Sequence, residues 1–131
     1  MTTTAHNFEF TNDLPTSSGT TLVVRISAGR NRKRRILAQY AGQLRVPDYF
    51  GWNWDAFEEC LRDLSWLVGI EHVVIVHRDV PFATSAENQQ TYLSILQDRL
   101  NETQANAPSL RVIFPTSARQ VVQNAIRQRL Q

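Results

Sequence analysis

The sequence predicts an α/β fold in which a small parallel sheet is packed by helices. Three short segments rich in β-branched residues, at 22–26, 73–76 and 110–114, are typical of strands. The stretches between them carry apolar residues at helical spacing, so strands and helices alternate along the chain. This alternation implies right-handed crossovers between parallel strands. With 131 residues, 42% of them hydrophobic, the whole chain 1–131 is expected to form a single domain.

The first elements follow an entry segment at 1–20 that is rich in Thr, Ser and Asn. Within it only Phe8 and Phe10 alternate as in a short edge strand. The strand at 22–26 is broken by Gly29, and a helix follows that ends before Pro47. The apolar positions of this helix recur at helical spacing: Ile36, Leu37, Tyr40, Ala41 and Leu44.

The next helix has a clear start signal at Asn53, a residue type that favours the N-cap. Asp55 then lies in the first turn, where a negative charge meets the positive end of the helix dipole. The apolar spacing predicts that the helix runs to about Leu67 and is closed by Gly69. Its inward stripe consists of Trp54, Phe57, Leu61 and Leu64.

The remaining elements complete the alternation. Four consecutive β-branched residues at 73–76 predict a strand buried on both faces. A helix is expected over 86–103, and Pro115 stops the strand at 110–114. An additional amphipathic helix is predicted over 117–130, with Ser117 as its N-cap.

Several classes of protein are disfavoured by the composition. No apolar run approaches the roughly 20 residues that cross a bilayer, and residues 1–14 lack the pattern of a secretion signal, so a cytoplasmic protein is expected. Cys60 is the single cysteine, and the three histidines lack metal-ligand spacing. The chain has no glycine-rich phosphate loop and no nucleophile motif. We therefore expect no enzyme, no cofactor and no metal.

The net charge of +2 conceals a strong segregation of charge. Residues 25–45 carry seven basic and no acidic side chains, whereas residues 46–71 carry six acidic side chains against Arg62 alone. Asp55 and Glu59 are four residues apart and so share one helix face. The preceding loop places Tyr49, Phe50 and Trp52 around Gly51, a composition found at interfaces. This face is either a partner-binding surface or a solvated helix face.

The basic residues are concentrated at the start of the first helix, where positive charge opposes the helix dipole. Such a cluster can bind phosphates, but it has no interleaved aromatic residue and no nucleic-acid recognition motif. A solvated face, contact with an acidic protein and contact with nucleic acid therefore stay open. The candidate residues are Arg32, Lys33, Arg34 and Arg35.

The stretch PDYFGWNWDAFEECL, residues 47–61, resembles the loop and second helix of the barstar family of intracellular ribonuclease inhibitors. The order of the surrounding elements is similar too, over about residues 21–115, which would form a barstar-like core. The resemblance implies a three-stranded parallel sheet and an acidic helix that occludes a ribonuclease active site. The partner-binding residues that it implies are Tyr49, Gly51, Asn53, Trp54, Asp55, Glu58 and Glu59, with Asp98 as an outer contact.

Three features depart from the family pattern. Glu59 is a methylene longer than the usual aspartate, Glu58 replaces an aromatic residue, and the overall charge is basic. We therefore expect an antitoxin or immunity-type inhibitor whose cognate ribonuclease is not barnase itself. Two alternatives remain: a nucleic-acid-associated module that uses the basic cluster Arg30–Arg35, and a barstar-fold domain that binds a partner other than a nuclease.

Overall fold

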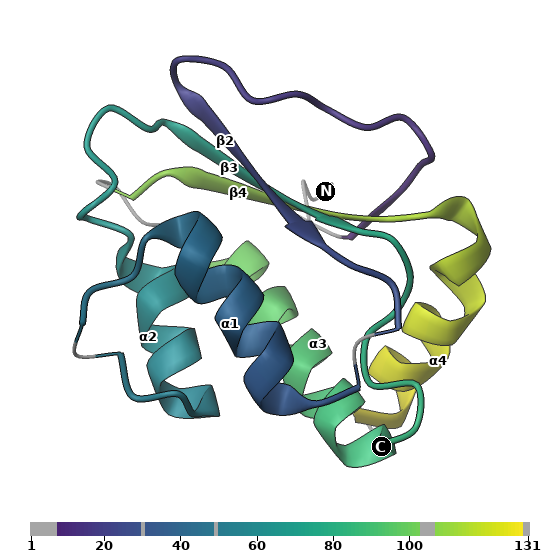
Figure 1. Ribbon diagram of the computed structural model, residues 1–131. Coiled ribbons are helices and arrows are strands. Elements are labelled where there is room, and N and C mark those ends of the chain that lie inside the picture. Colours follow the sequence, from purple (N-terminus) through teal and green to yellow (C-terminus); the bar gives the residue numbers. More distant parts are fainter. Residues whose placement is uncertain (1–7, 30, 49, 103–106, 130–131) are drawn as a thin grey trace.

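The computed structural model describes residues 8–29, 31–48, 50–102 and 107–129. Within these ranges the chain is an α/β protein with one sheet of four parallel strands in the order β1-β4-β3-β2. Helices α1, α2 and α3 lie on one side of the sheet, and α4 lies beside α3 (Figure 1). The strands are β1 (Glu9–Phe10), β2 (Thr21–Ile26), β3 (His72–His77) and β4 (Ser109–Phe114). The helices are α1 (Lys33–Leu44), α2 (Trp54–Asp63), α3 (Ala86–Asn101) and α4 (Arg119–Arg129).

The expected count of three strands is wrong, because the entry segment contributes β1 to the sheet. This two-residue strand pairs in parallel with the end of β4. Two oxygens of Glu9 accept hydrogen bonds from Arg111 on β4, at 2.7 and 2.8 Å. The Phe8 ring packs edge-on against Phe114, with 5.4 Å between the ring centroids. These contacts fix a strand that is too short to give more than a weak sequence signal.

Two helix ends also differ from the sequence-based expectation. Helix α2 ends at Asp63 because Leu64 adopts a left-handed conformation, with φ 50°. Leu64 and Leu67 are nevertheless buried, so their apolar spacing reflects a turn that folds back onto the core. At the other end of the chain Ser117 lies in a 3₁₀ turn, Thr116–Ala118, and α4 begins after it.

Strand β3 lies in the interior of the sheet, as its four β-branched residues predicted. Val73 and Ile75 belong to the main core on the helical side. Val74 and Val76 belong to a smaller cluster that also contains Val23 and Ile113. The strand is therefore buried on both faces.

The outer edge of β2 is covered by side chains of α1. The Gln43 side chain accepts a hydrogen bond from the Arg25 N–H at 2.7 Å and donates one to the Arg25 carbonyl at 2.8 Å. The Gln39 side chain accepts a hydrogen bond from the Ser27 N–H and donates one to the Ser27 hydroxyl. These amides bond the backbone groups that a neighbouring strand would otherwise bond. They thereby protect the edge of the sheet, because unpaired strand edges can associate with other chains. They also fix α1 against the sheet.

A buried chain of polar groups links the sheet to the helices. His77 Nδ1 donates to the Ile113 carbonyl at 3.0 Å, and His77 Nε2 accepts from the Tyr92 hydroxyl at 2.7 Å. The Tyr92 hydroxyl lies 2.5 Å from that of Tyr40 on α1. Burial lowers the pKa of His77 to about 3, against a smaller opposing effect of the Ile113 hydrogen bond. His77 is thus a neutral, fully bonded structural histidine.

This burial should make the fold sensitive to acid. Below pH 6.5 the unfolded chain protonates His77 while the folded chain does not, so the free energy of unfolding should fall as the pH falls towards 3. One such group contributes roughly 1 kcal/mol per pH unit. We expect His77→Gln to flatten the pH dependence of urea unfolding between pH 6.5 and 4, relative to the unsubstituted chain. The exposed His72 is the matched control, and His72→Gln should keep the original slope. Parallel curves for His77→Gln and the unsubstituted chain would contradict this role.

Candidate functional site

The inner face of α2 is fixed by a cluster of aromatic rings. Phe57 is buried, stacks on Tyr92 at 6.0 Å between ring centroids and contacts Tyr40 at 4.6 Å. Trp54 is half-buried and packs against Tyr92 and Phe82. Rings of this size bury large apolar areas and contribute strongly to packing. The aromatic cluster therefore determines how α2 lies on α1 and α3.

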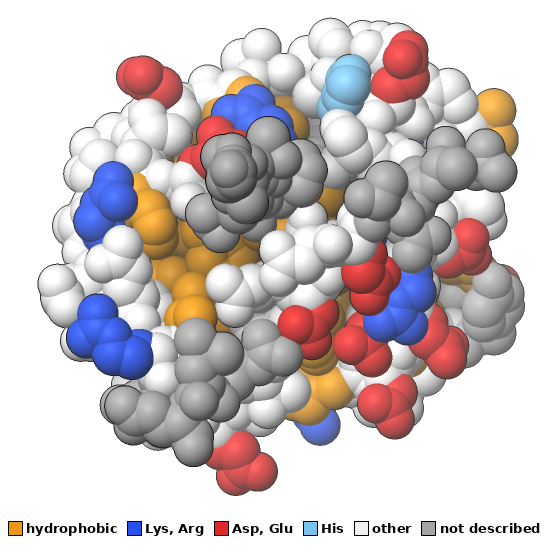
Figure 2. All heavy atoms as spheres, turned by 180° about the vertical axis from the view of Figure 1, so that it is seen from behind, with side chains coloured by type: hydrophobic (Ala, Val, Ile, Leu, Met, Phe, Trp, Pro, Cys, Tyr) orange, Lys and Arg blue, Asp and Glu red, His pale blue; other side chains and the backbone are white. Residues whose placement is uncertain are grey.

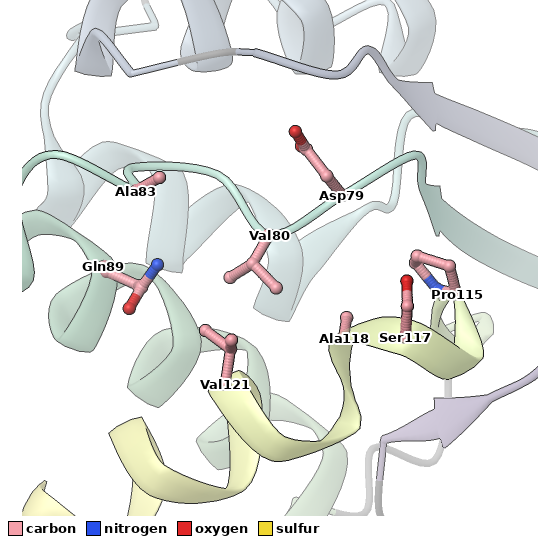
Figure 3. A pocket seen from close by; sticks show the side chains of 8 residues that line it. All are labelled: Asp79, Val80, Ala83, Gln89, Pro115, Ser117, Ala118 and Val121. Carbon is pink, nitrogen blue, oxygen red and sulfur yellow. The ribbon is translucent and has the colours of Figure 1, made fainter.

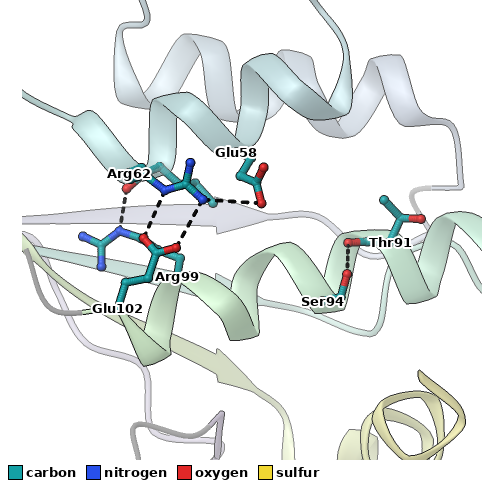
Figure 4. A network of polar contacts seen from close by, with 7 residues as sticks. Glu58, Arg62, Thr91, Ser94, Arg99 and Glu102 are labelled. Atoms are coloured by element: carbon teal, nitrogen blue, oxygen red, sulfur yellow. Dashed lines mark hydrogen bonds and ion pairs between the residues drawn. The ribbon is translucent and has the colours of Figure 1, made fainter. Parts of the chain in front are cut away.

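The second half of α2 is fixed by Arg99 of α3 (Figure 4). This buried arginine donates from Nε to the Leu61 carbonyl at 2.6 Å and from Nη2 to the Pro108 carbonyl at 3.0 Å. Burial lowers the pKa of Arg99, and the nearby Glu102 opposes that effect. Arg62 adds two hydrogen bonds to Glu102, at 3.1 and 3.2 Å. Both halves of α2 are thus attached to α3.

The start of α2 has the expected cap. The Asn53 side-chain oxygen accepts a hydrogen bond from the Ala56 N–H at 2.7 Å, and its amide group donates to the Gly51 carbonyl at 3.3 Å. A β-carbon at Gly51 would lie 3.2 Å from the Asn53 amide nitrogen, so only glycine leaves the cap undisturbed. Gly51 and Asn53 therefore shape the loop, whatever else they contact.

Three carboxylates follow the outer face of α2, and we call Asp55, Glu59 and Asp63 the acidic stripe. Their spacing of four residues aligns them, and all three side chains are exposed. Within the part of the chain that the structure describes, none of them has an ion-pair partner. Figure 2 shows acidic side chains gathered around a basic one at the side of the molecule where α2 lies. No carboxylate of the acidic stripe therefore forms an ion pair in the described ranges, although the charge of Glu59 acts on the nearby Arg62.

Glu58 differs from the acidic stripe, because its carboxylate lies 3.7 Å from Arg62, one turn along the helix. The hydrogen bond to Glu102, more than the nearby Glu58, raises the pKa of Arg62. Glu58 is also half-buried. Its charge is thus partly compensated within the chain.

A small hollow lies beside the acidic stripe. It has a volume of about 190 Å³, and its walls include Glu59, Asp63, Phe50 and Trp66. Cys60 also lines it, and burial, followed by the charges of Asp63 and Glu59, raises the pKa of its thiol. A thiol kept protonated is a poor nucleophile. Two carboxylates and two rings in the same wall suit a cationic side chain instead.

The basic cluster lies next to this surface. The Arg34 guanidinium is 4.7 Å from the centre of the Trp52 ring, and the Lys33 ammonium is 5.9 Å from the centre of the Trp54 ring. The sequence showed no aromatic residue among these cations, but the fold places two tryptophans against them. Trp52 was not among the predicted site residues. The sequence signal for it was its place in the aromatic loop before α2, and the structure adds that it is exposed and that its backbone has φ 55°.

The predicted site residues are only partly brought together. Those on α2 and in the loop before it are neighbours: Gly51, Asn53, Trp54, Asp55, Glu58 and Glu59. Of these, only Asp55 and Glu59 lie on the outer face of α2, whereas Trp54 packs inward against Phe82 and Tyr92. Asp98 is half-buried on α3, one turn before Glu102. Arg32 is the N-cap of α1, and Lys33, Arg34 and Arg35 form its first turn. Tyr49 and Arg30, the first residue of the basic cluster, lie outside the described residues.

A larger cavity of about 400 Å³ lies elsewhere, after the ends of β3 and β4 (Figure 3). Its lining includes Val80, Val121 and Gln89. The Asp79 carboxylate is directed away from the two valines, and its Oδ2 accepts from the Gly29 N–H at 3.0 Å. Across the described ranges, no three His, Cys, Asp or Glu side chains gather as metal ligands, and no helix has the length and apolar character to cross a membrane.

Comparison with known protein families identifies most of the chain. A family model described as Barstar (barnase inhibitor) matches residues 21–115, which is most of the chain. No curated protein matches the chain.

The cap at Asn53 can be tested by substitution. We expect Asn53→Ala to lower the free energy of unfolding by about 1 kcal/mol, because the Ala56 N–H loses its acceptor. Asn53→Asp keeps an oxygen at this position and should retain most of the stability. Urea denaturation of the three proteins measures both effects. Equal losses for alanine and aspartate would show that the cap hydrogen bond is not what stabilises this turn.

Proposed function

The chain belongs to the barstar family, and from this premise we propose that it inhibits a ribonuclease in the cytoplasm. In this proposal α2 and the loop before it occlude the active site of the enzyme stoichiometrically, as an antitoxin or immunity protein does. The inhibitor itself performs no catalysis.

The observation that carries the proposal is the exposure of the acidic stripe, none of whose carboxylates forms an ion pair in the described ranges. A ribonuclease active site holds a polyanion and must therefore be cationic. Carboxylates at one-turn intervals on a helix offer such a site negative charge without a cleavable phosphodiester bond. Charge complementarity of this kind also accelerates association.

The attachment of α2 supports the same proposal. Rings on its inner face, Arg99 and the Arg62–Glu102 pair restrain the helix before any partner arrives. Less conformational entropy is then lost on binding, which favours affinity. The hollow between Glu59 and Asp63 would receive a lysine, arginine or histidine of the enzyme.

The other predicted contacts are expected to contribute less to binding than Asp55 and Glu59. Glu58 contributes less than Asp55 or Glu59, because Arg62 already compensates its charge. Trp54 is assigned mainly to packing, and Asn53 and Gly51 to the shape of the loop. Tyr49 and Asp98 are proposed as contacts at the periphery.

A second candidate is nucleic-acid binding through Arg32, Lys33, Arg34 and Arg35. Aromatic rings beside cations are common in single-strand binding sites, and Trp52 and Trp54 supply such rings here. The neighbouring acidic stripe opposes this function, since it would repel phosphates. Binding of this kind would fall steeply with salt.

Capture of the partner tests the proposed function. The tagged chain is used to isolate proteins from the cytoplasm of its source, and the captured fraction is assayed for ribonuclease activity after dissociation. We expect a ribonuclease that is inactive in the complex and active once released. A captured partner without ribonuclease activity would instead support an interaction domain of another kind.

The acidic stripe should dominate affinity for the captured ribonuclease. We expect Asp55→Ala and Glu59→Ala each to weaken binding by about 3 kcal/mol, as loss of a desolvated interfacial charge can. Glu58→Ala should cost about 1 kcal/mol or less, as partly exposed ion pairs do. Isothermal titration calorimetry measures the three affinities.

The matched control is Glu71→Ala, which removes an exposed carboxylate from the loop before β3. It should leave the affinity unchanged, and circular dichroism should show that all four variants keep the fold. Unchanged binding by both Asp55→Ala and Glu59→Ala would remove the acidic stripe from the interface.

A further inference from the structure

The basic cluster borders the acidic stripe at the point where α1 and α2 both begin. In Figure 1 these two ends lie at the same side of the helical layer. Arg34 lies over Trp52, which directly precedes the Asn53 cap, and Lys33 lies over Trp54, which directly precedes Asp55. A partner that covers the start of α2 therefore also faces these two cations.

Arg34 is arranged to bind an anion from outside the chain. A guanidinium stacked over a ring keeps its N–H groups at its edge, where they can grip a carboxylate with two hydrogen bonds. Arg34 is exposed, and within the described ranges no carboxylate pairs with Arg32, Lys33, Arg34 or Arg35. The first turn of α1 contains no acidic residue either.

Trp52 has the features of an interface anchor. Its side chain is 36% exposed although its ring packs edge-on against Phe50, at 5.2 Å between centroids. Its backbone is left-handed, with φ 55°, a conformation that bulky residues rarely adopt and that is often found at functional sites. Tryptophan and arginine are also the residue types most enriched among interface hot spots.

The combined charges define the partner. A uniformly cationic enzyme would be attracted by the acidic stripe but repelled by Arg34 and Lys33, and such like-charge contacts discriminate strongly between partners. Nucleic acid would be attracted by Arg34 and Lys33 but repelled by the carboxylate of Asp55, which directly follows Trp54. Only a partner with both signs of charge fits the whole surface.

We propose that Trp52, Arg34 and Lys33 form a cationic extension of the site, which binds a carboxylate patch beside the cationic cleft of the partner enzyme. The extension thereby selects the cognate enzyme from other basic nucleases. The proposal rests on the proposed function for the identity of the partner. The preference of the cationic extension for carboxylates does not depend on that partner and can be measured on this chain by itself.

That preference is measured with three probes at low salt: a hexaglutamate peptide, a hexaarginine peptide and octauridylate. NMR titration of the full chain follows the indole N–H of Trp52. We expect hexaglutamate to shift this resonance, and the double variant Lys33→Gln/Arg34→Gln to weaken that binding at least fivefold. Hexaarginine should bind through the acidic stripe, so Asp55→Asn/Glu59→Gln should weaken it and leave hexaglutamate binding intact or stronger.

Arg127→Gln is the matched control, because Arg127 is exposed on α4 and its loss changes the charge in the same direction. It should bind hexaglutamate as the unsubstituted chain does. No response of Trp52 to hexaglutamate, or equal weakening by Arg127→Gln, would overturn the proposal. Tighter binding of octauridylate than of hexaglutamate at Trp52 would also overturn it, in favour of nucleic acid.

The captured ribonuclease gives the second readout. Lys33→Gln/Arg34→Gln should bind it about tenfold more weakly, and Arg127→Gln should not. If no ribonuclease is captured, the proposed function fails while the peptide titrations still decide the carboxylate preference. If a ribonuclease is captured and the double variant binds it unchanged, only the cationic extension fails.

Discussion

The geometry of the candidate site depends on the environment of one buried side chain, Tyr92 of α3. Its hydroxyl joins His77 of β3 to Tyr40 of α1, and its ring contacts Trp54 and Phe57 of α2. Contacts from β3, α1 and α2 thus converge on this residue of α3, in a region where unsatisfied polar groups would be costly. Movement of α2 would break ring contacts and expose this network. The orientation of the outer face of α2 is therefore set by the core.

Because the core fixes the orientation of α2, the charged side chains on its outer face have fixed positions. Asp55, Glu59 and Asp63 are held at regular intervals on a helix attached to α3 along its length. Arg62 pairs with Glu102 and Glu58, and the charge of Glu59 acts on it more weakly. The start of α1 brings opposite charge to the same surface through Trp52 and Trp54. A protein with a small net charge thus presents two strong local fields side by side, which favours selectivity as well as attraction.

Sequence patterns predicted the parts of this structure that depend on local signals. Four β-branched residues identified β3, Asn53 identified the start of α2, and spacing placed the acidic stripe on one face. The patterns were weak or wrong where distant contacts decide. The alternation of Phe8 and Phe10 indicated the edge strand β1, but the pairing of Glu9 with Arg111, about a hundred residues away, attaches it to the sheet, and α2 ends early because Leu64 turns back to the core. The pairing of Arg34 with Trp52 joins separate elements, so no periodicity could reveal it.

The central claim is that the acidic stripe occupies the place of RNA in the active site of the partner. Steady-state inhibition of the captured ribonuclease, measured at several RNA concentrations, tests this claim most directly. The account predicts competitive inhibition, in which the apparent inhibition constant rises linearly with RNA concentration while kcat at saturating RNA is unchanged. An inhibition constant independent of RNA concentration, with a lowered kcat, would show that the chain binds away from the active site and would contradict the account.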